Sequence, residues 1–259
     1  MDRLNSSKEE ALSFMCDLAG TARGMAIEGM GARAVSKADG SPVTEVDLSI
    51  NDFVLAEVKR SWPNCGVLGE EASREVYAEC VYVVDPLDGT AAYAAGLGVS
   101  SFVMAYVVRG ETLAGVVDDP FTGTRFSAVL GGGAWCNGEA LSLSGPSRSN
   151  MVAIEALRGG GIDDLALQAG LSGRGFYPVR YLSFANLAVR VASGAIAGAV
   201  FGKASSWDCL APALIVSEAG GVVRSVSGGE FAGMSAREGV VMTNSEYTDA
   251  ILQAVAEAC

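Results

Sequence analysis

The sequence of 259 residues contains no histidine. This absence excludes catalytic triads and dyads in which histidine is the general base, and it excludes zinc and iron sites that use imidazole ligands. Carboxylates, hydroxyls, thiols and lysines remain as the groups that could carry out catalysis or hold a metal. An enzymatic function must therefore rest on one of these kinds of group.

Positive charge is also scarce, because 18 Lys and Arg residues stand against 30 Asp and Glu residues and the formal net charge is −12. A surface that follows a nucleic-acid backbone needs clustered lysines and arginines, so we expect no nucleic-acid partner. Half of the residues are hydrophobic and 19% are charged, which is typical of a globular protein. If the protein binds a phosphate, something other than a basic patch must neutralise it.

Long hydrophobic runs are missing as well. The longest weakly polar stretch, residues 185–201, is interrupted by Arg190 and is shorter than the ~20 apolar residues that span a bilayer. The chain starts with a polar segment that does not have the form of a signal peptide. We therefore expect no membrane partner and a cytoplasmic location.

The six cysteines include no C-x-x-C pair and show no clustered spacing. Disulfide frameworks are typical of short secreted domains, whereas cytosolic proteins of this size usually keep their thiols reduced. The sequence therefore predicts reduced cysteines.

The length is consistent with one large domain or with two halves. Between residues 142 and 150 the composition changes to Ser, Gly, Pro and Arg, which is typical of a boundary. We predict a first half of residues 1–145 with α+β organisation and a second half of residues 146–259 with α/β organisation.

In the first half, helical spacing of apolar residues predicts helices from about residue 7 and over 44–60. The apolar run 81–84 predicts a buried strand that ends at Asp85. Three β-like runs follow and predict an antiparallel meander over residues 100–108, 112–117 and 124–130.

In the second half, strands and helices alternate. A helix is expected over about 208–219. Since proline has no backbone N–H to donate inside a helix, Pro212 would move the start of this helix toward residue 211.

The segment Asp85-Pro86-Leu87-Asp88-Gly89-Thr90 carries the densest chemical signal. A strand that ends at Asp85 can direct two carboxylates and the carbonyl of Leu87 at one point. These are hard oxygen ligands suited to Mg²⁺, and the backbone donors of Gly89 and Thr90 at a following helix start suit a phosphate. The same residue types also occur in ordinary turns, so this segment alone leaves both interpretations open.

Three further acidic elements are weaker signals when each is taken alone. Glu70 and Glu71 follow an apolar pair, but glutamates in loops are usually solvated. Asp208 lies at the start of a predicted helix, and Asp47 lies three residues after Thr44 at the start of another. Helix capping is the simpler explanation for both aspartates.

Taken together, the four elements have a recognisable order. The motifs S-P-V-T-x-x-D, G-E-E, D-P-L-D-G-T and W-D followed by E-A-G-G resemble, in order and approximate spacing, those of the inositol monophosphatase family of lithium-sensitive, Mg²⁺-dependent phosphomonoesterases. The resemblance covers nearly the whole chain. It implies a layered αβαβα fold, a homodimer, and a metal site between the halves, with most ligands in residues 1–145.

The resemblance also implies roles for individual residues. Two or three Mg²⁺ ions would be held by Glu70, Asp85, the Leu87 carbonyl, Asp88 and Asp208. Asp47 and Thr90, with Glu70, would orient and help to deprotonate the attacking water. The substrate would contact Asp88, Gly89, Thr90, Asp208 and, from the second half, Ser183, Phe184 and Phe201.

The physical chemistry of such a site is consistent with the composition. Carboxylates a few ångströms apart raise one another's pKa unless divalent cations neutralise them. The same cations turn an acidic site into a phosphate receptor, and a pair of metals can assist both attack and departure of the leaving group. Neither histidine nor a covalent nucleophile is needed.

The recognition side departs from the family pattern. Inositol-type members commonly have an acidic residue about seven positions before the W-D aspartate, where this chain has Phe201. The segment Arg180 to Asn186 also lacks the family's glycine and places Phe184 near the substrate position. Arg180 and Lys203 could instead meet a second anionic group of the substrate.

We therefore predict Mg²⁺-dependent hydrolysis of a small phosphate monoester, either inositol-phosphate-like or a sugar phosphate. Alternative substrates are fructose 1,6-bisphosphate, histidinol phosphate and a 3′-phosphonucleotide, and an alternative function is a catalytically silent relative that binds metal and phosphate. A dehydrogenase is disfavoured because no G-x-G-x-x-G follows a strand. A thiol enzyme is disfavoured because Asp208 next to Cys209 opposes thiolate formation.

Overall fold

The computed structural model describes residues 2–155, 161–180, 182–203, 205–235 and 239–259. Up to residue 141 the elements are α1 (Asp2–Glu28), β1 (Val35–Ser36), β2 (Pro42–Val43), α2 (Glu45–Ser61), β3 (Gly66–Gly69), β4 (Cys80–Asp88), α3 (Thr90–Ala94), β5 (Ser101–Val108), β6 (Glu111–Asp119), β7 (Thr124–Val129), β8 (Gly133–Cys136) and β9 (Glu139–Leu141). They are followed by β10 (Met151–Glu155), α4 (Asp164–Gly173), β11 (Tyr177–Val179), α5 (Phe184–Ala192), β12 (Gly198–Phe201), α6 (Ser206–Glu218), β13 (Val222–Ser225), η1 (Gly233–Ser235), β14 (Val240–Thr243), η2 (Ser245–Tyr247) and α7 (Thr248–Ala258).

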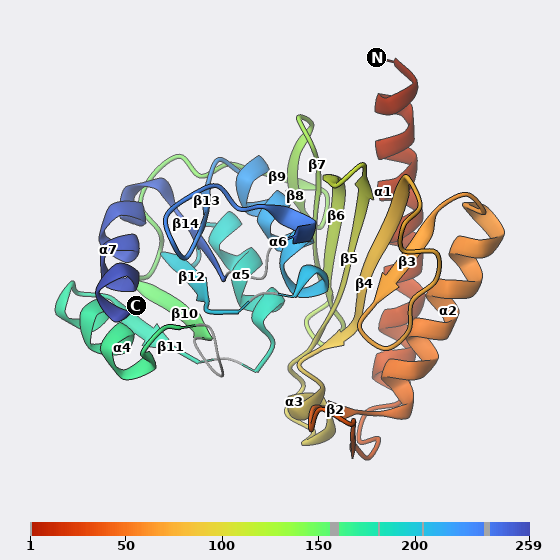
Figure 1. Cartoon of the computed structure of the whole chain (residues 1–259), viewed down its shortest axis with the longest axis horizontal. Helices are drawn as coiled ribbons and strands as arrows, with labels where there is room; N and C mark the ends of the chain where they lie inside the picture. Colours follow the sequence, from red (N-terminus) through yellow and green to blue (C-terminus); the bar gives the residue numbers. More distant parts are fainter. Residues whose placement is uncertain (1, 156–160, 181, 204, 236–238) are drawn as a thin grey trace.

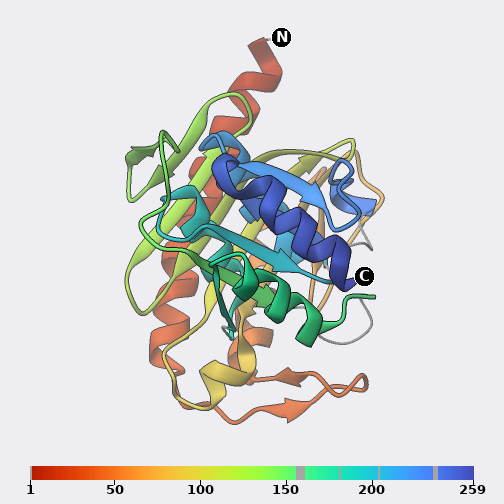
Figure 2. The same cartoon turned by 90° about the vertical axis from the view of Figure 1, so that its left-hand side faces the viewer.

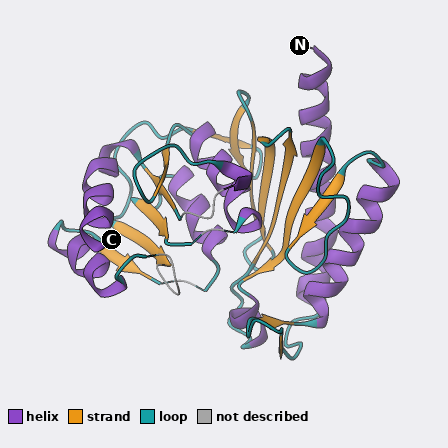
Figure 3. Cartoon of the chain, in the orientation of Figure 1, coloured by secondary structure: helices purple, strands orange, loops and turns teal. Residues whose placement is uncertain are grey.

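The elements form alternating layers of helices and strands (Figure 1, Figure 3). Helices α1 and α2 cover the outer face of a seven-stranded sheet with the order β3-β4-β5-β6-β7-β8-β9. Helices α5 and α6 lie between this sheet and a five-stranded sheet with the order β11-β10-β12-β14-β13. Helices α4 and α7 cover the outer face of the second sheet (Figure 2). The predicted αβαβα arrangement is confirmed.

Both sheets are mixed. In the first sheet β3 runs parallel to β4 and the remaining neighbours are antiparallel, so β5 to β7 form the predicted meander. In the second sheet β10 runs parallel to β11 and β12. The predicted boundary after residue 145 falls in the connection between β9, the last strand of the first sheet, and β10, the first strand of the second.

Helix α2 shows how the local sequence positions part of the site. Thr44 is its N-cap and forms a reciprocal capping box with Asp47, because each side chain accepts a hydrogen bond from the other residue's backbone N–H. Val46, Ile50 and Val54 follow at helical spacing and are buried against the seven-stranded sheet. Asp47 is therefore held at the inner side of the first turn rather than in solvent.

The strand expected to end at Asp85 continues to Asp88. Asp85 pairs with Val103 and Asp88 pairs with Ser101, with a register shift between the two pairs. The prediction that the strand ends at Asp85 is wrong, since pairing with β5 persists past Pro86. The bulge is the feature that separates the two aspartates along the strand edge.

Helix α6 begins at Ser206 rather than near residue 211, and Pro212 lies inside it. The missing N–H of Pro212 removes the hydrogen bond to the carbonyl of Asp208. The helix tolerates this loss because residues 209 to 216 are all buried between the two sheets.

The expectation of reduced cysteines is wrong for Cys65 and Cys80, which form a disulfide. The parallel pairing of β3 with β4 places Gly66 opposite Val81, so the residues that precede this pair lie side by side with a Cα–Cα distance of 4.8 Å. Cys16, Cys136, Cys209 and Cys259 are free. Among the described residues no helix is long and apolar enough to cross a bilayer.

Candidate functional site

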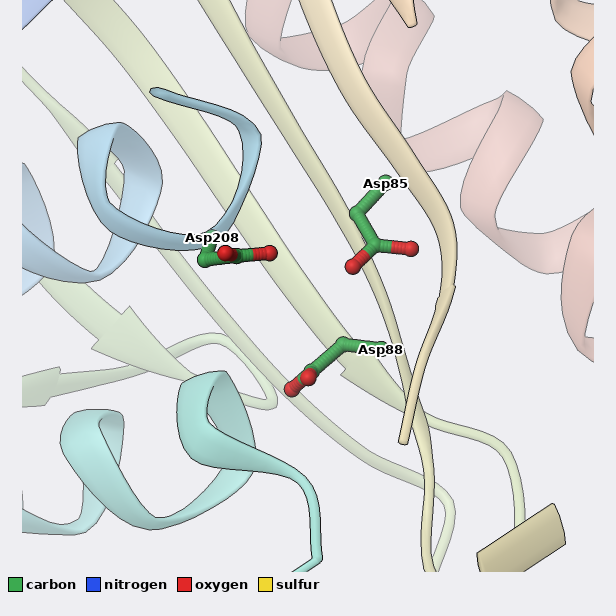
Figure 4. A group of neighbouring side chains, drawn as sticks. All are labelled: Asp85, Asp88 and Asp208. Atoms are coloured by element: carbon green, nitrogen blue, oxygen red, sulfur yellow. The ribbon is translucent and has the colours of Figure 1, made fainter. Parts of the chain in front are cut away.

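Three aspartates from distant parts of the sequence converge between the two sheets. Asp85 and Asp88 lie at the end of β4, and Asp208 lies in the first turn of α6 (Figure 4). One carboxylate oxygen from each residue lies within 4.8 Å of the other two. The fold therefore brings together three of the carboxylates that the sequence singled out.

The crowding of these carboxylates disfavours their charged forms. Burial, followed by the charges of Glu70, Asp88 and Asp208, raises the pKa of Asp85 well above its ordinary value. Burial, followed by Asp88 and Glu70, does the same to the pKa of Asp208. Three hard oxygen donors at this separation fit a divalent cation such as Mg²⁺, because its charge offsets both the burial and the repulsion.

Asp88 is held through one of its two oxygens. Oδ2 accepts hydrogen bonds from the Ser183 hydroxyl at 2.6 Å, the Ala185 backbone N–H at 2.8 Å and the Ser101 hydroxyl at 3.3 Å. Burial raises the pKa of Asp88 to about 6, and these three hydrogen bonds oppose the shift. Ser183 was predicted to contact the substrate, but its hydroxyl donates a hydrogen bond to Asp88. Ser101, which also donates to Asp88, was not identified by the sequence analysis.

Asp47 and Thr90 form the second part of the site. The Thr90 hydroxyl lies 2.8 Å from Asp47 Oδ1 and 3.2 Å from the carbonyl oxygen of Leu87. Asp47 is fully buried, and its Oδ2 accepts hydrogen bonds from the backbone N–H and the hydroxyl of Thr44. Asp47, the acidic member of the capping box of α2, thus also accepts a hydrogen bond from Thr90, the residue that begins α3.

Gly89 allows the segment that follows β4 to approach the residues that precede α5 closely. Its φ is +93°, which favours glycine, and a Cβ built there would lie 2.6 Å from the carbonyl oxygen of Leu182. Gly89 precedes α3, so the N-terminus of this short helix lies next to Asp88.

Glu70 is engaged by a lysine that the sequence analysis did not identify. The Lys37 ammonium lies 2.8 Å from Glu70 Oε1 and 2.7 Å from Glu71 Oε1. Burial lowers the pKa of Lys37, but the two carboxylates outweigh it and the net shift is upward. Lys37 lies in the turn between β1 and β2, and its position 33 residues before Glu70 left no local pattern to detect.

The two phenylalanines predicted to face the substrate are stacked on each other. The ring centroids of Phe184 and Phe201 are 4.2 Å apart, and the residues expose only 4% and 8% of their surface. Both belong to the apolar core between the sheets. A contact with substrate stays a prediction for both residues, and only a small part of either residue is exposed to make it.

Three charged residues belong to the part of the chain predicted to recognise the substrate. Arg180 forms an ion pair with Asp164, and Lys203 is exposed. Glu155, which the sequence analysis missed, lies at the end of β10 opposite Phe201. Burial and the charge of Asp88 raise the pKa of Glu155 to about 7, against the effect of Arg180.

Comparison with known proteins gives consistent results over the whole chain. Residues 7–258 match the model of the inositol monophosphatase family. Inositol monophosphatase 2 of Solanum lycopersicum is 32% identical over 232 residues, covering 83% of this chain and 85% of the relative. A fructose-1,6-bisphosphatase/inositol-1-monophosphatase of Thermotoga maritima is 29% identical over 216 residues, covering 83% and 82%.

A solved structure of an inositol monophosphatase from Thermotoga maritima superimposes with a TM-score of 0.84 at 26% identity. The match covers 100% of this chain and 98% of that one. The layers described above are therefore a known arrangement, and the converging aspartates lie within the matched region.

Proposed function

This chain belongs to the inositol monophosphatase family of phosphatases, and we propose that it hydrolyses a small phosphate monoester with Mg²⁺ and a water molecule activated by Asp47 and Thr90. The observation that carries the proposal is the convergence of one oxygen from each of Asp85, Asp88 and Asp208 within 4.8 Å. The hydrogen-bonded pair of Thr90 and Asp47 adds a proton acceptor near the same strand end.

The residues fit the metal that the family implies. Asp85, Asp88 and Asp208, with Glu70 and the Leu87 carbonyl, would hold the ions through oxygen alone, which is the ligand set that Mg²⁺ prefers. When bound, Mg²⁺ neutralises the phosphate and makes water more acidic. Lys37 contacts Glu70 through Oε1, so Oε2 would serve this role.

Thr90 and Asp47 supply the path for a proton. Thr90 donates its hydroxyl hydrogen to Asp47 Oδ1, so lone pairs of the threonine oxygen remain free to accept a hydrogen from water. As water attacks phosphorus, its proton passes to the Thr90 oxygen while the threonine proton passes to Asp47. The phosphorus–oxygen bond to the leaving group breaks, the leaving alkoxide takes a proton from solvent, and Asp47 returns its proton to solvent, which restores the starting state.

The substrate is proposed to be an ester other than inositol 1-phosphate. Phe201 stands where inositol-type members have an acidic residue, and its ring packs on Phe184. Loss of an acceptor for hydroxyl groups costs ~0.5 to 1.5 kcal/mol per hydrogen bond. Sugar phosphates, fructose 1,6-bisphosphate, histidinol phosphate and 3′-phosphonucleotides are the alternatives to compare.

Other properties are proposed on the family resemblance alone. These are a complement of two to three Mg²⁺ ions, inhibition by Li⁺ and a homodimer. The disulfide between Cys65 and Cys80 argues against the predicted cytoplasmic location, because disulfides are rare in reducing compartments.

The test is phosphate release from a panel of these esters with and without Mg²⁺. We expect activity that requires Mg²⁺ and disappears with a chelator, and a kcat/KM for the best ester at least roughly tenfold above that for inositol 1-phosphate, a gap of ~1.4 kcal/mol. Turnover that survives exhaustive metal removal would contradict the proposal. A protein that binds Mg²⁺ and phosphate but hydrolyses no ester would be the catalytically silent relative.

A further inference from the structure

The hydrogen bonds to Asp88 come from two separate elements of the fold. Ser183 and the Ala185 N–H belong to the start of α5, whereas Ser101 is the first residue of β5, the strand that pairs with β4. All three hydrogen bonds end on Oδ2. The Ser183 hydroxyl and the Ala185 N–H already occupy both lone pairs of Oδ2, so Oδ1 is the oxygen available to a cation.

Helix α5 has an unusual N-terminus. Serine is a favoured N-cap because its hydroxyl can accept a hydrogen bond from the first turn. Ser183 occupies the N-cap position, yet its side chain makes no such bond to the described residues of its own helix. It donates to Asp88, and the Asp88 carboxylate accepts the Ala185 N–H. Asp88 thus caps α5 from another layer of the fold.

The two serines form a short chain of hydroxyls. Ser101 Oγ and Ser183 Oγ are 3.1 Å apart, and both residues are fully buried. Because the Ser183–Asp88 contact is the shortest of the set, Ser183 donates its single proton to Asp88, and Ser101 can donate to Ser183 or to Asp88. Buried hydroxyls aligned in this way polarise one another and strengthen the last bond of the chain.

The backbone around this contact leaves little room for movement. A Cβ on Gly89 would lie 3.0 Å from the Cβ of Ser183 and 2.6 Å from the Leu182 carbonyl oxygen. The end of β4 and the start of α5 therefore touch directly, and the Asp88 carboxylate has a fixed neighbour on one side.

We propose that Ser183 and Ser101 are positioning residues that fix Asp88 as a ligand through Oδ1 alone. The inference rests on the proposed function for the identity of the metal. The serines touch neither the substrate nor the reacting atoms in this scheme. They couple the metal site to the packing of α5 against β4, so a ligand of the first sheet is oriented by a helix that lies between the sheets.

The test compares Ser183→Ala, Ser183→Thr and Ser101→Ala for binding of Mn²⁺ alone, measured by electron paramagnetic resonance of the free ion, with no substrate present. We expect about a tenfold loss of Mn²⁺ affinity in Ser183→Ala, in the range observed when groups that orient metal ligands are removed. Ser183→Thr retains the hydroxyl and should stay within about threefold of the unaltered protein. Ser101→Ala should show an intermediate loss, because it is one step further along the chain of hydroxyls.

Ser193→Ala is the matched control, since Ser193 is the C-cap of the same helix and its hydroxyl donates to the carbonyl of Arg190. It should bind Mn²⁺ like the unaltered protein. If Ser183→Ala binds Mn²⁺ as tightly as this control, the positioning role is refuted. If Ser183→Ala does not fold, unchanged Mn²⁺ affinity in Ser101→Ala refutes it.

The Mn²⁺-binding experiments can distinguish a failure of the positioning role from a failure of the proposed function. Mn²⁺ binding that depends on Ser183 in a protein without phosphatase activity would support the positioning role and contradict the enzymatic proposal. An unaltered protein that binds no Mn²⁺ would overturn both.

Discussion

The two sides of the candidate site are built in different ways. On the catalytic side, Asp85 and Asp88 lie at a strand end of the seven-stranded sheet, and the Asp47–Thr90 pair lies beside them at two helix starts. On the recognition side, Phe184 and Phe201 pack into the core between the sheets. The first side presents carboxylates such as Asp88, one oxygen of which is already hydrogen-bonded, whereas the second presents apolar rings and the half-buried carboxylate of Glu155.

This difference indicates how the chemistry and the choice of substrate can vary separately. Proposed ligands that are fixed by a strand and by helix caps should keep their geometry when side chains that do not hydrogen-bond to them change. Side chains at the ends of β10 and β12 do not belong to that strand or to those helix caps. Substitutions there should therefore alter which alcohol is accepted without altering the need for Mg²⁺. The predictions below test that separation.

The largest effect is expected for Asp88→Asn. The amide oxygen can still accept the hydrogen bonds from Ser183 and Ala185, which turns the NH₂ group toward the position of the cation. The protein should fold, but kcat/KM should fall by roughly 10²- to 10³-fold or more. Steady-state kinetics together with a thermal unfolding curve check this, and near-normal turnover at ordinary Mg²⁺ concentrations would show that Asp88 is no ligand.

A smaller loss, restricted to turnover, is expected for Thr90→Ala. The substitution removes the hydroxyl that links water to Asp47, so kcat should fall by about 10²-fold, as is usual for a lost proton-transfer group. Mn²⁺ affinity should stay within about threefold, because no metal carboxylate is removed. Equal losses of metal affinity in Thr90→Ala and Asp88→Asn would contradict the separate roles.

The stability of the metal-free protein should depend on pH through the same carboxylates. Burial raises the pKa of Asp88 to about 6 and that of Glu155 to about 7, and it raises those of Asp85 and Asp208 as well. Groups with raised pKa values in the folded state contribute stability that is complete below about pH 4 and is lost as the pH rises through these values.

With a chelator present, Tm should therefore fall between pH 5 and pH 8, and Mg²⁺ should restore roughly 5 °C or more at pH 8 but less at pH 5. Calorimetry at the two pH values, with and without Mg²⁺, measures this. A matched series with Asp88→Asn should show a shallower pH dependence. A Tm that rises with pH in the chelated protein would mean that the carboxylate cluster does not control stability.

The catalytic side was largely predictable from the sequence because its residues lie in local patterns. Asp85 and Asp88 follow an apolar strand, Asp208 starts a helix, and Asp47 sits in a capping box, so each position carried a signal of its own. Their roles as ligands and as a proton acceptor stay proposals. The αβαβα layers followed from the resemblance of the four motifs to a known family.

The remaining features depend on contacts between distant elements. The Cys65–Cys80 disulfide needs the register of β3 with β4, and the hydroxyl of Ser101 reaches Asp88 only because β5 pairs with β4 past the bulge. The stacking of Phe184 on Phe201 requires that α5 pack against β12. No window of sequence contains these relations, which is why the recognition side was assigned only by analogy.

The smallest effect is expected on the recognition side, at Glu155. This residue lies opposite Phe201 at the end of β10, half-buried, and its charge acts on both Asp88 and Asp208. A carboxylate at this place can accept hydrogen bonds from hydroxyl or ammonium groups of the leaving alcohol. Glu155→Gln keeps the size but removes the charge, so KM for esters with such groups should rise about three- to tenfold while kcat and the Mg²⁺ dependence change little.

Phe201→Leu is the matched control for that variant, because it replaces the neighbouring aromatic ring by a smaller apolar side chain without altering charge. It should change KM for hydroxylated and apolar esters alike, since it removes packing rather than a polar partner. The ratio of KM values for an ester that bears hydroxyl or ammonium groups and one that bears none is therefore the decisive quantity. If Glu155→Gln leaves that ratio unchanged, the carboxylate does not face the alcohol. If it reduces kcat as strongly as Thr90→Ala does, Glu155 belongs to the catalytic side, and the division between the two sides of the site is wrong.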